Sequence, residues 1–168
     1  MQLYSHLFFD CDGVILDSNH IKTKSFYEIA LNFGEINAKK LVNFHTSNGG
    51  ISRYVKLKYF TEEILGVCDE EIYNQLVIDY GNLVKKYLLK CSIDDGILKI
   101  HNYLPKIKKA IISGSDQSEL NWLFKKRKIN KIFDLGIFGS PKNKQEIFEE
   151  IYSDFTGKEK CLFFGDSK

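Results

Sequence analysis

Short apolar runs mark the two ends of the chain. Residues 6–9 run directly into Asp10, and residues 160–164 run into Gly165 and Asp166. Continuous apolar runs of this length are typical of strands that are buried on both faces of a parallel sheet. Two further runs predict strands of the same kind: residues 110–112, which precede Ser113, Gly114 and Ser115, and the weaker run 135–139.

Helical patterns separate these runs. One covers about 116–127, with Asp116 in the N-cap position, and another covers about 143–154. A third begins at Asp94 or Asp95 and reaches Tyr103. Alternation of buried strand and helix predicts an α/β fold with a doubly wound parallel sheet.

The stretch from about 19 to 90 breaks this alternation. It holds three long amphipathic patterns, at about 19–33, 50–65 and 69–90, and no convincing strand. We therefore expect a core domain formed by residues 1–18 and 91–168, with a helical insertion at 19–90.

Composition excludes several classes of protein. Hydrophobic residues make up 43% of the 168 residues and charged residues 27%, which is ordinary for a globular domain. The net charge of +2 argues against nucleic acid as a partner. The first residues resemble neither a signal peptide nor a membrane span. The four cysteines have no CxxC spacing, so we expect reduced thiols in a cytoplasmic protein.

Two carboxylates, Asp10 and Asp12, follow the first predicted strand. In an open parallel sheet the carboxyl ends of the strands are where ligands bind. Two like charges held close together repel, so each needs a cation or a shared proton. A hard divalent cation such as Mg²⁺ satisfies this need through oxygen ligands. The alternative is a turn with two solvated acids, which is less consistent with the flanking sequences LFF and VILDS.

The sequence FFDCDGVILDS resembles the first motif of the haloacid dehalogenase superfamily. The other family motifs follow in order: IISGS resembles the second, GSPKNKQEIF the third and CLFFGDS the fourth. The resemblance covers the whole chain. It implies a Rossmann-like core with an inserted α-helical cap, and a Mg²⁺-dependent phosphomonoester hydrolase that works through an aspartyl-phosphate.

The resemblance also assigns roles to individual residues. It implies that Asp10 is the nucleophile and Asp12 the general acid and base, and that Ser113 and Lys144 bind the phosphoryl group. Mg²⁺ would be held by Asp10, by the backbone carbonyl of Asp12 and by Asp166. Gly114, beside Ser113, is expected to contact substrate.

Two positions leave alternatives open. Lys142 and Lys144 both fit the third motif, and Lys144 is preferred because it stands at the start of the predicted helix. The related sugar phosphomutases carry a histidine ten residues after the second aspartate, where this chain has Lys22. This favours a phosphatase over a phosphomutase. The acid at position 12 argues against a dehalogenase, because a leaving halide needs no proton.

The stretch 45–53 looks like the substrate loop of the family's cap. Gly49 and Gly50 would allow close approach of a ligand, while Ser52 and Arg53 are expected to contact substrate. For Arg53, the sequence does not favour a substrate contact over the alternative, which is a surface ion pair. His45 is expected to be a loop residue.

The chain ends two residues after Asp166, whereas the family's fourth motif carries a second acid four residues after the first. We expect the last strand and helix of the core to be missing, and the resulting sheet edge is a predicted site of self-association. The expected substrate is a small phosphorylated metabolite, most simply a sugar phosphate. The competing hypotheses are a phosphomutase and a non-catalytic domain that binds a phosphorylated ligand.

Overall fold

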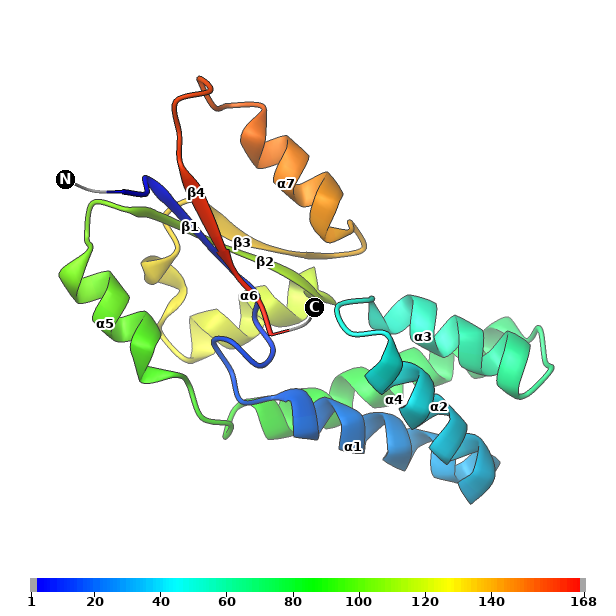
Figure 1. Ribbon diagram of the computed structural model, residues 1–168. Coiled ribbons are helices and arrows are strands. Elements are labelled where there is room, and N and C mark those ends of the chain that lie inside the picture. Colours follow the sequence, from blue (N-terminus) through cyan, green and yellow to red (C-terminus); the bar gives the residue numbers. More distant parts are fainter. Residues whose placement is uncertain (1–2, 167–168) are drawn as a thin grey trace.

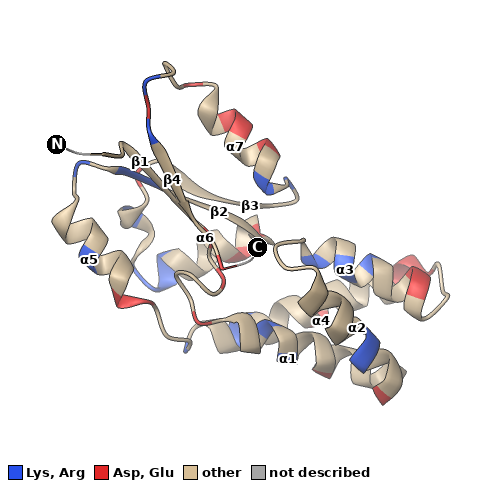
Figure 2. Cartoon of the chain, viewed as in Figure 1, with Lys and Arg blue, Asp and Glu red and all other residues tan. Residues whose placement is uncertain are grey.

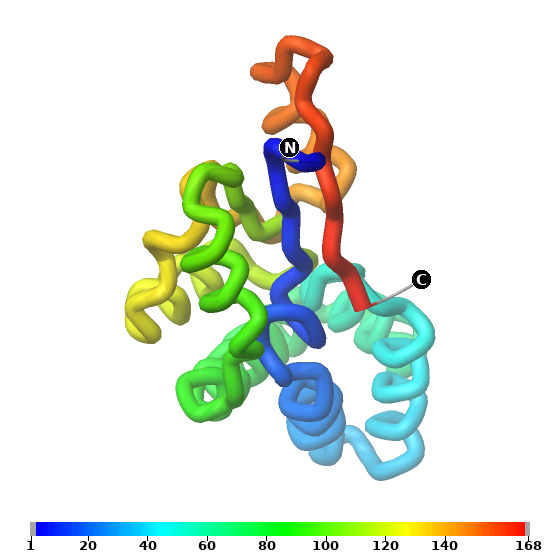
Figure 3. The backbone as a smooth tube through the Cα atoms, turned by 60° about the vertical axis from the view of Figure 1, so that its left-hand side comes forward, coloured from blue at the N-terminus to red at the C-terminus, as the bar shows by residue number. Residues whose placement is uncertain are grey.

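A four-stranded parallel sheet forms the centre of the computed structural model, which describes residues 3–166. The strands are β1 (His6–Phe9), β2 (Lys108–Asp116), β3 (Gly136–Ser140) and β4 (Cys161–Phe164), in the order β3-β2-β1-β4. All neighbouring pairs are parallel. Figures 1 and 3 show β1 and β4 side by side, although they come from opposite ends of the chain. The predicted doubly wound parallel sheet is confirmed.

Helices cover both faces of this sheet (Figure 1). The helix α7 (Lys144–Tyr152) packs on one face, where Phe8, Ile112 and Ile147 form a small apolar cluster. The helices α5 (Asp95–Tyr103) and α6 (Gln117–Lys126) pack on the other face within the main core. Both faces of the central strands are therefore buried, which explains their continuous apolar sequences.

The predicted helix starts in the core are confirmed by their capping bonds. Asp94 accepts a bond from the backbone N–H of Gly96, and Asp116 accepts one from that of Glu119. Asn143 forms a capping box with Glu146 at the start of α7. These bonds satisfy backbone donors that a helix start leaves free.

The stretch between β1 and α5 holds four α-helices: α1 (Asn19–Ala30), α2 (Glu35–Ser47), α3 (Arg53–Tyr59) and α4 (Glu70–Leu88). A π-helical turn, Phe60–Ile64, continues α3. Three of these helices match the predicted amphipathic patterns, but α2 was missed. It follows Gly34, which provides no side-chain capping bond, and buries only Ala38 and Leu41. We call this helical unit the cap.

Two connecting segments join the cap to the sheet domain, and they lie against each other. The N–H of Asp17 donates to the carbonyl of Ser92, and the N–H of Asp94 donates to that of Ile15. The cap is thus an insertion that leaves and re-enters the core at one place, next to the carboxyl end of β1 (Figure 1).

Among the described residues, no helix is both long enough and apolar enough to span a bilayer.

Candidate active site

A cavity of about 500 Å³ lies between the carboxyl ends of the strands and the cap. The core contributes carboxylates, backbone and a hydroxyl to its lining: Asp10, Asp12, Gly114, Ser115 and Asp166. The cap contributes basic and aromatic side chains, among them Lys22, Phe26, His45, Arg53, Lys56 and Tyr80. Its volume suits a small organic molecule. Figure 2 shows basic residues on α3 of the cap and at the start of α7 in the core.

Asp10 directly follows β1 and is almost fully buried. Its Oδ1 accepts a 2.7 Å bond from the backbone N–H of Cys11, and its Oδ2 accepts a bond from Nζ of Lys144. Burial raises the pKa of Asp10, and the contact with Lys144 opposes this shift. Lys142 instead pairs with Glu150 on the exposed side of α7. Of the two candidate lysines, Lys144 is therefore the one that reaches the carboxylate, as the preferred assignment requires.

Asp12 is enclosed by three donors. Its Oδ1 accepts from Oγ of Ser18 at 2.5 Å, and its Oδ2 accepts from Nζ of Lys22 at 2.5 Å and from Oγ of Ser115 at 2.6 Å. Burial alone would raise the pKa of Asp12, but the charge of Lys22 and these hydrogen bonds lower it below its ordinary value. The carboxylate is therefore ionised and rigidly oriented.

The end of β2 approaches the cap at backbone level. A Cβ placed on Gly114 would meet the carbonyl oxygen of Gly50 at 2.1 Å, so only glycine allows this contact. Ser113 is fully buried, and its Oγ accepts a 3.1 Å bond from the N–H of Ser115. Gly114 and Ser115 line the cavity. Ser113 is not among the lining residues.

Asp166 lies at the end of β4 and also lines the cavity. Its Oδ2 accepts a 2.7 Å bond from Nδ2 of Asn19, the first residue of α1. Gly13 has a positive φ of 72°, and a Cβ there would meet Asp166 Oδ2 at 2.1 Å. The turn after β1 is therefore shaped to admit this carboxylate.

The donor chemistry of the cavity fits Mg²⁺. Asp10 and Asp166 supply carboxylate oxygens, and the side chain of Asp12 is already occupied, which leaves its backbone carbonyl. Magnesium is often bound by one or two carboxylates and keeps several water ligands. Within residues 3–166, no group of three or more His, Cys, Asp or Glu side chains is arranged so that it could hold a metal by itself.

The family follows from the whole sequence. A family model described as haloacid dehalogenase-like hydrolase matches residues 4–168. The chain belongs to the haloacid dehalogenase-like hydrolases. The predicted family and the assignment as an enzyme are thus confirmed. No curated protein sequence matches the chain.

Solved structures share the fold. A predicted phosphoglycolate phosphatase from Haemophilus somnus has a TM-score of 0.73 at 14% identity, covering 99% of this chain and 78% of its own. A β-phosphoglucomutase from Clostridium difficile has a TM-score of 0.70 at 19% identity (98% and 77%). CbbY from Rhodobacter sphaeroides, in complex with phosphate, scores 0.69 at 14% identity (96% and 77%). At these identities the likeness shows the haloacid dehalogenase fold alone.

The cap side of this hydrolase differs from the sequence prediction at His45, Ser52 and Arg53. His45, expected in a loop, lies in the last turn of α2, because that helix continues to Ser47. The loop is therefore limited to residues 48–52, with Ser52 as the N-cap residue of α3 and outside the cavity lining.

Arg53 is not a surface residue. Its Nη2 lies 2.6 Å from Oε2 of Glu119 on α6, and the two side chains are 7% and 1% exposed. Its guanidinium also stacks over the ring of Tyr80 at 4.9 Å. The surface ion pair considered for Arg53 is therefore wrong: the pair is buried, and it joins the cap to the core. Next to it, the hydroxyl of Tyr54 donates to Asp116 at 2.5 Å.

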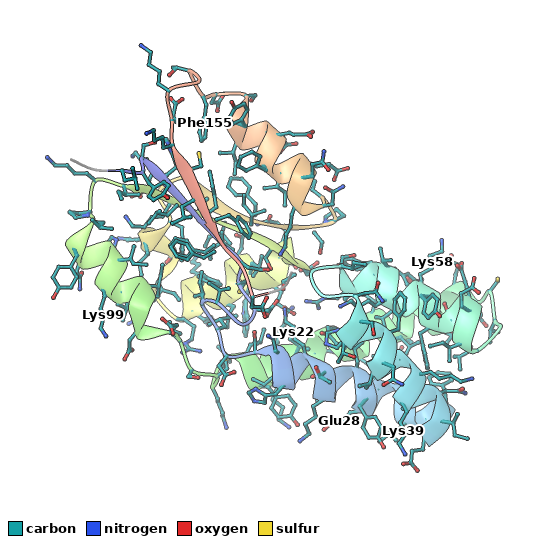
Figure 4. All side chains as sticks on the ribbon, in the orientation of Figure 1. Lys22, Glu28, Lys39, Lys58, Lys99 and Phe155 are labelled. Atoms are coloured by element: carbon teal, nitrogen blue, oxygen red, sulfur yellow. The ribbon has the colours of Figure 1, made fainter. Side chains whose placement is uncertain are left out.

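Several site residues had no predicted role. Ser18 and Ser115 lie inside the recognised motifs, which were the available signal, but only the fold shows that both donate to Asp12. Lys22, which is labelled in Figure 4, was noted for its position alone, and the fold brings its ammonium to Asp12. Asn19 and Lys56 lie in no recognised motif, and His45 was expected only as a residue of the substrate loop.

Proposed function

We propose that this hydrolase is a phosphomonoester hydrolase that transfers a phosphoryl group to Asp10 and then to water. The observation that carries the proposal is that Asp10 and Asp12 line the cavity and that Nζ of Lys144 lies against the carboxylate of Asp10. A carboxylate able to act as a nucleophile, a cation beside it and a second, separately held carboxylate meet there.

In the first step, an Oδ of Asp10 attacks phosphorus, and the bond from phosphorus to the ester oxygen breaks. The ammonium of Lys144 lies where negative charge gathers on the phosphoryl oxygens, and it stabilises that charge. The backbone at Gly114 lines the same cavity and orients the phosphoryl group.

In this reaction Asp12 transfers protons to the leaving oxygen and from the attacking water. Because the carboxylate of Asp12 is ionised, the proton that the leaving oxygen takes starts on the ammonium of Lys22 and is relayed by Asp12. Asp12 then accepts a proton from the water that attacks the aspartyl-phosphate, which releases inorganic phosphate and restores Asp10. Ser18 and Ser115 keep its two oxygens in place for both transfers.

Mg²⁺ would be held by Asp10, the carbonyl of Asp12 and Asp166. When bound, it supplies positive charge that offsets the phosphoryl oxygens and the acids. The expected substrate is a small phosphorylated metabolite, for which a sugar phosphate is the simplest candidate.

The test is phosphate release from a panel of phosphomonoesters with Mg²⁺ present, combined with chromatography of the organic product. Free phosphate and the dephosphorylated product support the proposal. An isomerised phosphate ester would establish a phosphomutase instead. Binding of phosphorylated ligands without turnover would establish a non-catalytic domain.

A further inference from the structure

Lys56 is a buried cation in the cap wall of the cavity. It lies on α3, is only 3% exposed and lines the cavity. Its Nζ is 2.9 Å from Nδ1 of His45 and 3.4 Å from the carbonyl oxygen of His45, and it stands 5.8 Å from the ring centre of Phe26. None of these groups carries a negative charge that would balance the ammonium.

The other cations around the cavity each have a carboxylate. Lys22 pairs with Asp12, Arg53 with Glu119 and Lys144 with Asp10. Within residues 3–166, Lys56 has no Asp or Glu oxygen within 4.0 Å. Burial lowers the pKa of Lys56 to about 8, with a further contribution from the charge of Lys22. A buried, unpaired charge is costly unless a ligand compensates it.

His45 fixes the direction of this ammonium. Burial, followed by the charge of Lys56, lowers the pKa of His45 to about 4, so the imidazole is neutral near pH 7. Its Nε2 lies 3.1 Å from Oγ1 of Thr23, and a hydrogen donated to that oxygen leaves Nδ1 free to accept from Lys56. An ammonium has three donors. The two contacts with His45 leave at least one for a ligand in the cavity.

We propose that Lys56, oriented by His45, binds a second anionic group of the substrate, at the end opposite the phosphoryl group that Asp10 accepts. The inference rests on the proposed function and narrows its substrate class to phosphomonoesters that carry a further carboxylate or phosphate. Both groups offer oxygen acceptors with a full negative charge, which is what an unpaired buried ammonium requires. The cavity volume of about 500 Å³ leaves room for such a molecule.

The experiment compares Lys56→Met with Lys58→Met. Lys58, which is labelled in Figure 4, lies on the same helix, but its side chain is 61% exposed and pairs with Glu62, so its replacement is a matched control. Two pairs of compounds differ in the second anionic group. They are 3-phosphoglycerate against glycerol 3-phosphate for a carboxylate, and glucose 1,6-bisphosphate against glucose 6-phosphate for a phosphate.

We expect the protein to prefer the more anionic member of at least one pair. In that pair Lys56→Met should lower kcat/KM by about ten- to a hundredfold, the range for a lost charge-assisted bond, and should leave the less anionic member nearly unchanged. Lys58→Met should change neither. The pair that responds identifies carboxylate or phosphate as the group bound.

Affinity measured calorimetrically in the Asp10→Asn background separates this inference from the proposed function. If the wild type releases no phosphate from any compound, the proposed function fails, yet a Lys56-dependent preference in binding would still support the anion site. The anion-site proposal is overturned if Lys56→Met weakens both members of both pairs equally, or if it weakens neither member of either pair. A lower melting temperature for Lys56→Met than for Lys58→Met, without a change in preference, would show a merely structural lysine.

Discussion

The ammonium of Lys22 lies 2.5 Å from Oδ2 of Asp12, and both groups also contact Oγ of Ser115. A cation of the cap thereby lies against the carboxylate of Asp12, the residue that transfers protons in the proposed reaction. The position of the cap and the ionisation of Asp12 are consequently linked, since Lys22 belongs to α1.

Replacing Lys22 by Met should raise the pKa of Asp12, because the group that lowers it is removed. Turnover should fall by about a hundredfold, within the range for positioned acid–base catalysis. The acidic limb of the pH dependence of kcat should move to higher pH. Lys24→Met is the control, because Lys24 is exposed on the same helix and pairs with Glu28. An unchanged acidic limb in Lys22→Met would contradict the role given to the pair.

Replacing Asp10 by Asn keeps the size of the side chain and removes the nucleophilic oxygen charge. We expect turnover to fall about a thousandfold or more, since covalent catalysis is lost. The circular dichroism spectrum and melting curve should remain those of a folded protein. Asp17→Asn, at an exposed aspartate near the same strand, serves as control. Turnover near wild type in Asp10→Asn would refute the assignment of the nucleophile.

Arg53→Ala should destabilise the protein by about 3–5 kcal/mol, because it leaves Glu119 buried without its partner. The double variant Arg53→Met with Glu119→Gln should recover much of this loss, since no unpaired charge remains. Urea unfolding of the single and double variants measures both values. Arg53 also lines the cavity, so KM is measured in parallel. An additive double variant would mean that the two residues are not energetically coupled.

The lowered pKa of Lys56 predicts that the free energy of unfolding depends on pH in a specific way. Its pKa is lowered to about 8 in the folded protein, against about 10.4 in an unfolded chain, so the folded state binds fewer protons between these values. The charged ammonium of Lys56 therefore lowers the free energy of unfolding by its full amount below pH 8, and this effect disappears as the pH rises toward 10.5. Unfolding free energies of wild type and Lys56→Met should converge between pH 7 and pH 9.5. A constant difference would contradict the buried, unpaired state of Lys56.

The sequence predicted those parts of the site that local patterns encode. Asp10, Lys144 and Asp166 stand at strand ends or a helix start, and the strand topology alone brings such positions to one edge. Lys22 and Lys56 were not predictable in the same way. A lysine on an amphipathic helix usually faces solvent, and only the packing of α1 and α3 over the sheet turns these two inward.

The helix α2 was missed for a related reason. Its sequence buries only two side chains, and its N-cap residue Gly34 gives no polar signal. Its position depends instead on packing against its neighbours in the cap. The pairing of Arg53 with Glu119 likewise joins residues 66 positions apart, which no local pattern reveals. The domain boundaries at 18 and 90, and self-association through the β4 edge, stay predictions.

The contact between Gly50 and Gly114 has a consequence for selectivity. With no side chain between them, the cap loop and β2 meet backbone to backbone, and this sets the separation between Asp10 in the core and Lys56 in the cap. If Lys56 binds the second anionic group, the contact between the two glycines fixes the distance between the two ends of the site. A substrate must span the fixed interval between its two charged ends, so in a homologous series of ω-phosphorylated carboxylates one chain length should be hydrolysed far faster than its shorter and longer neighbours.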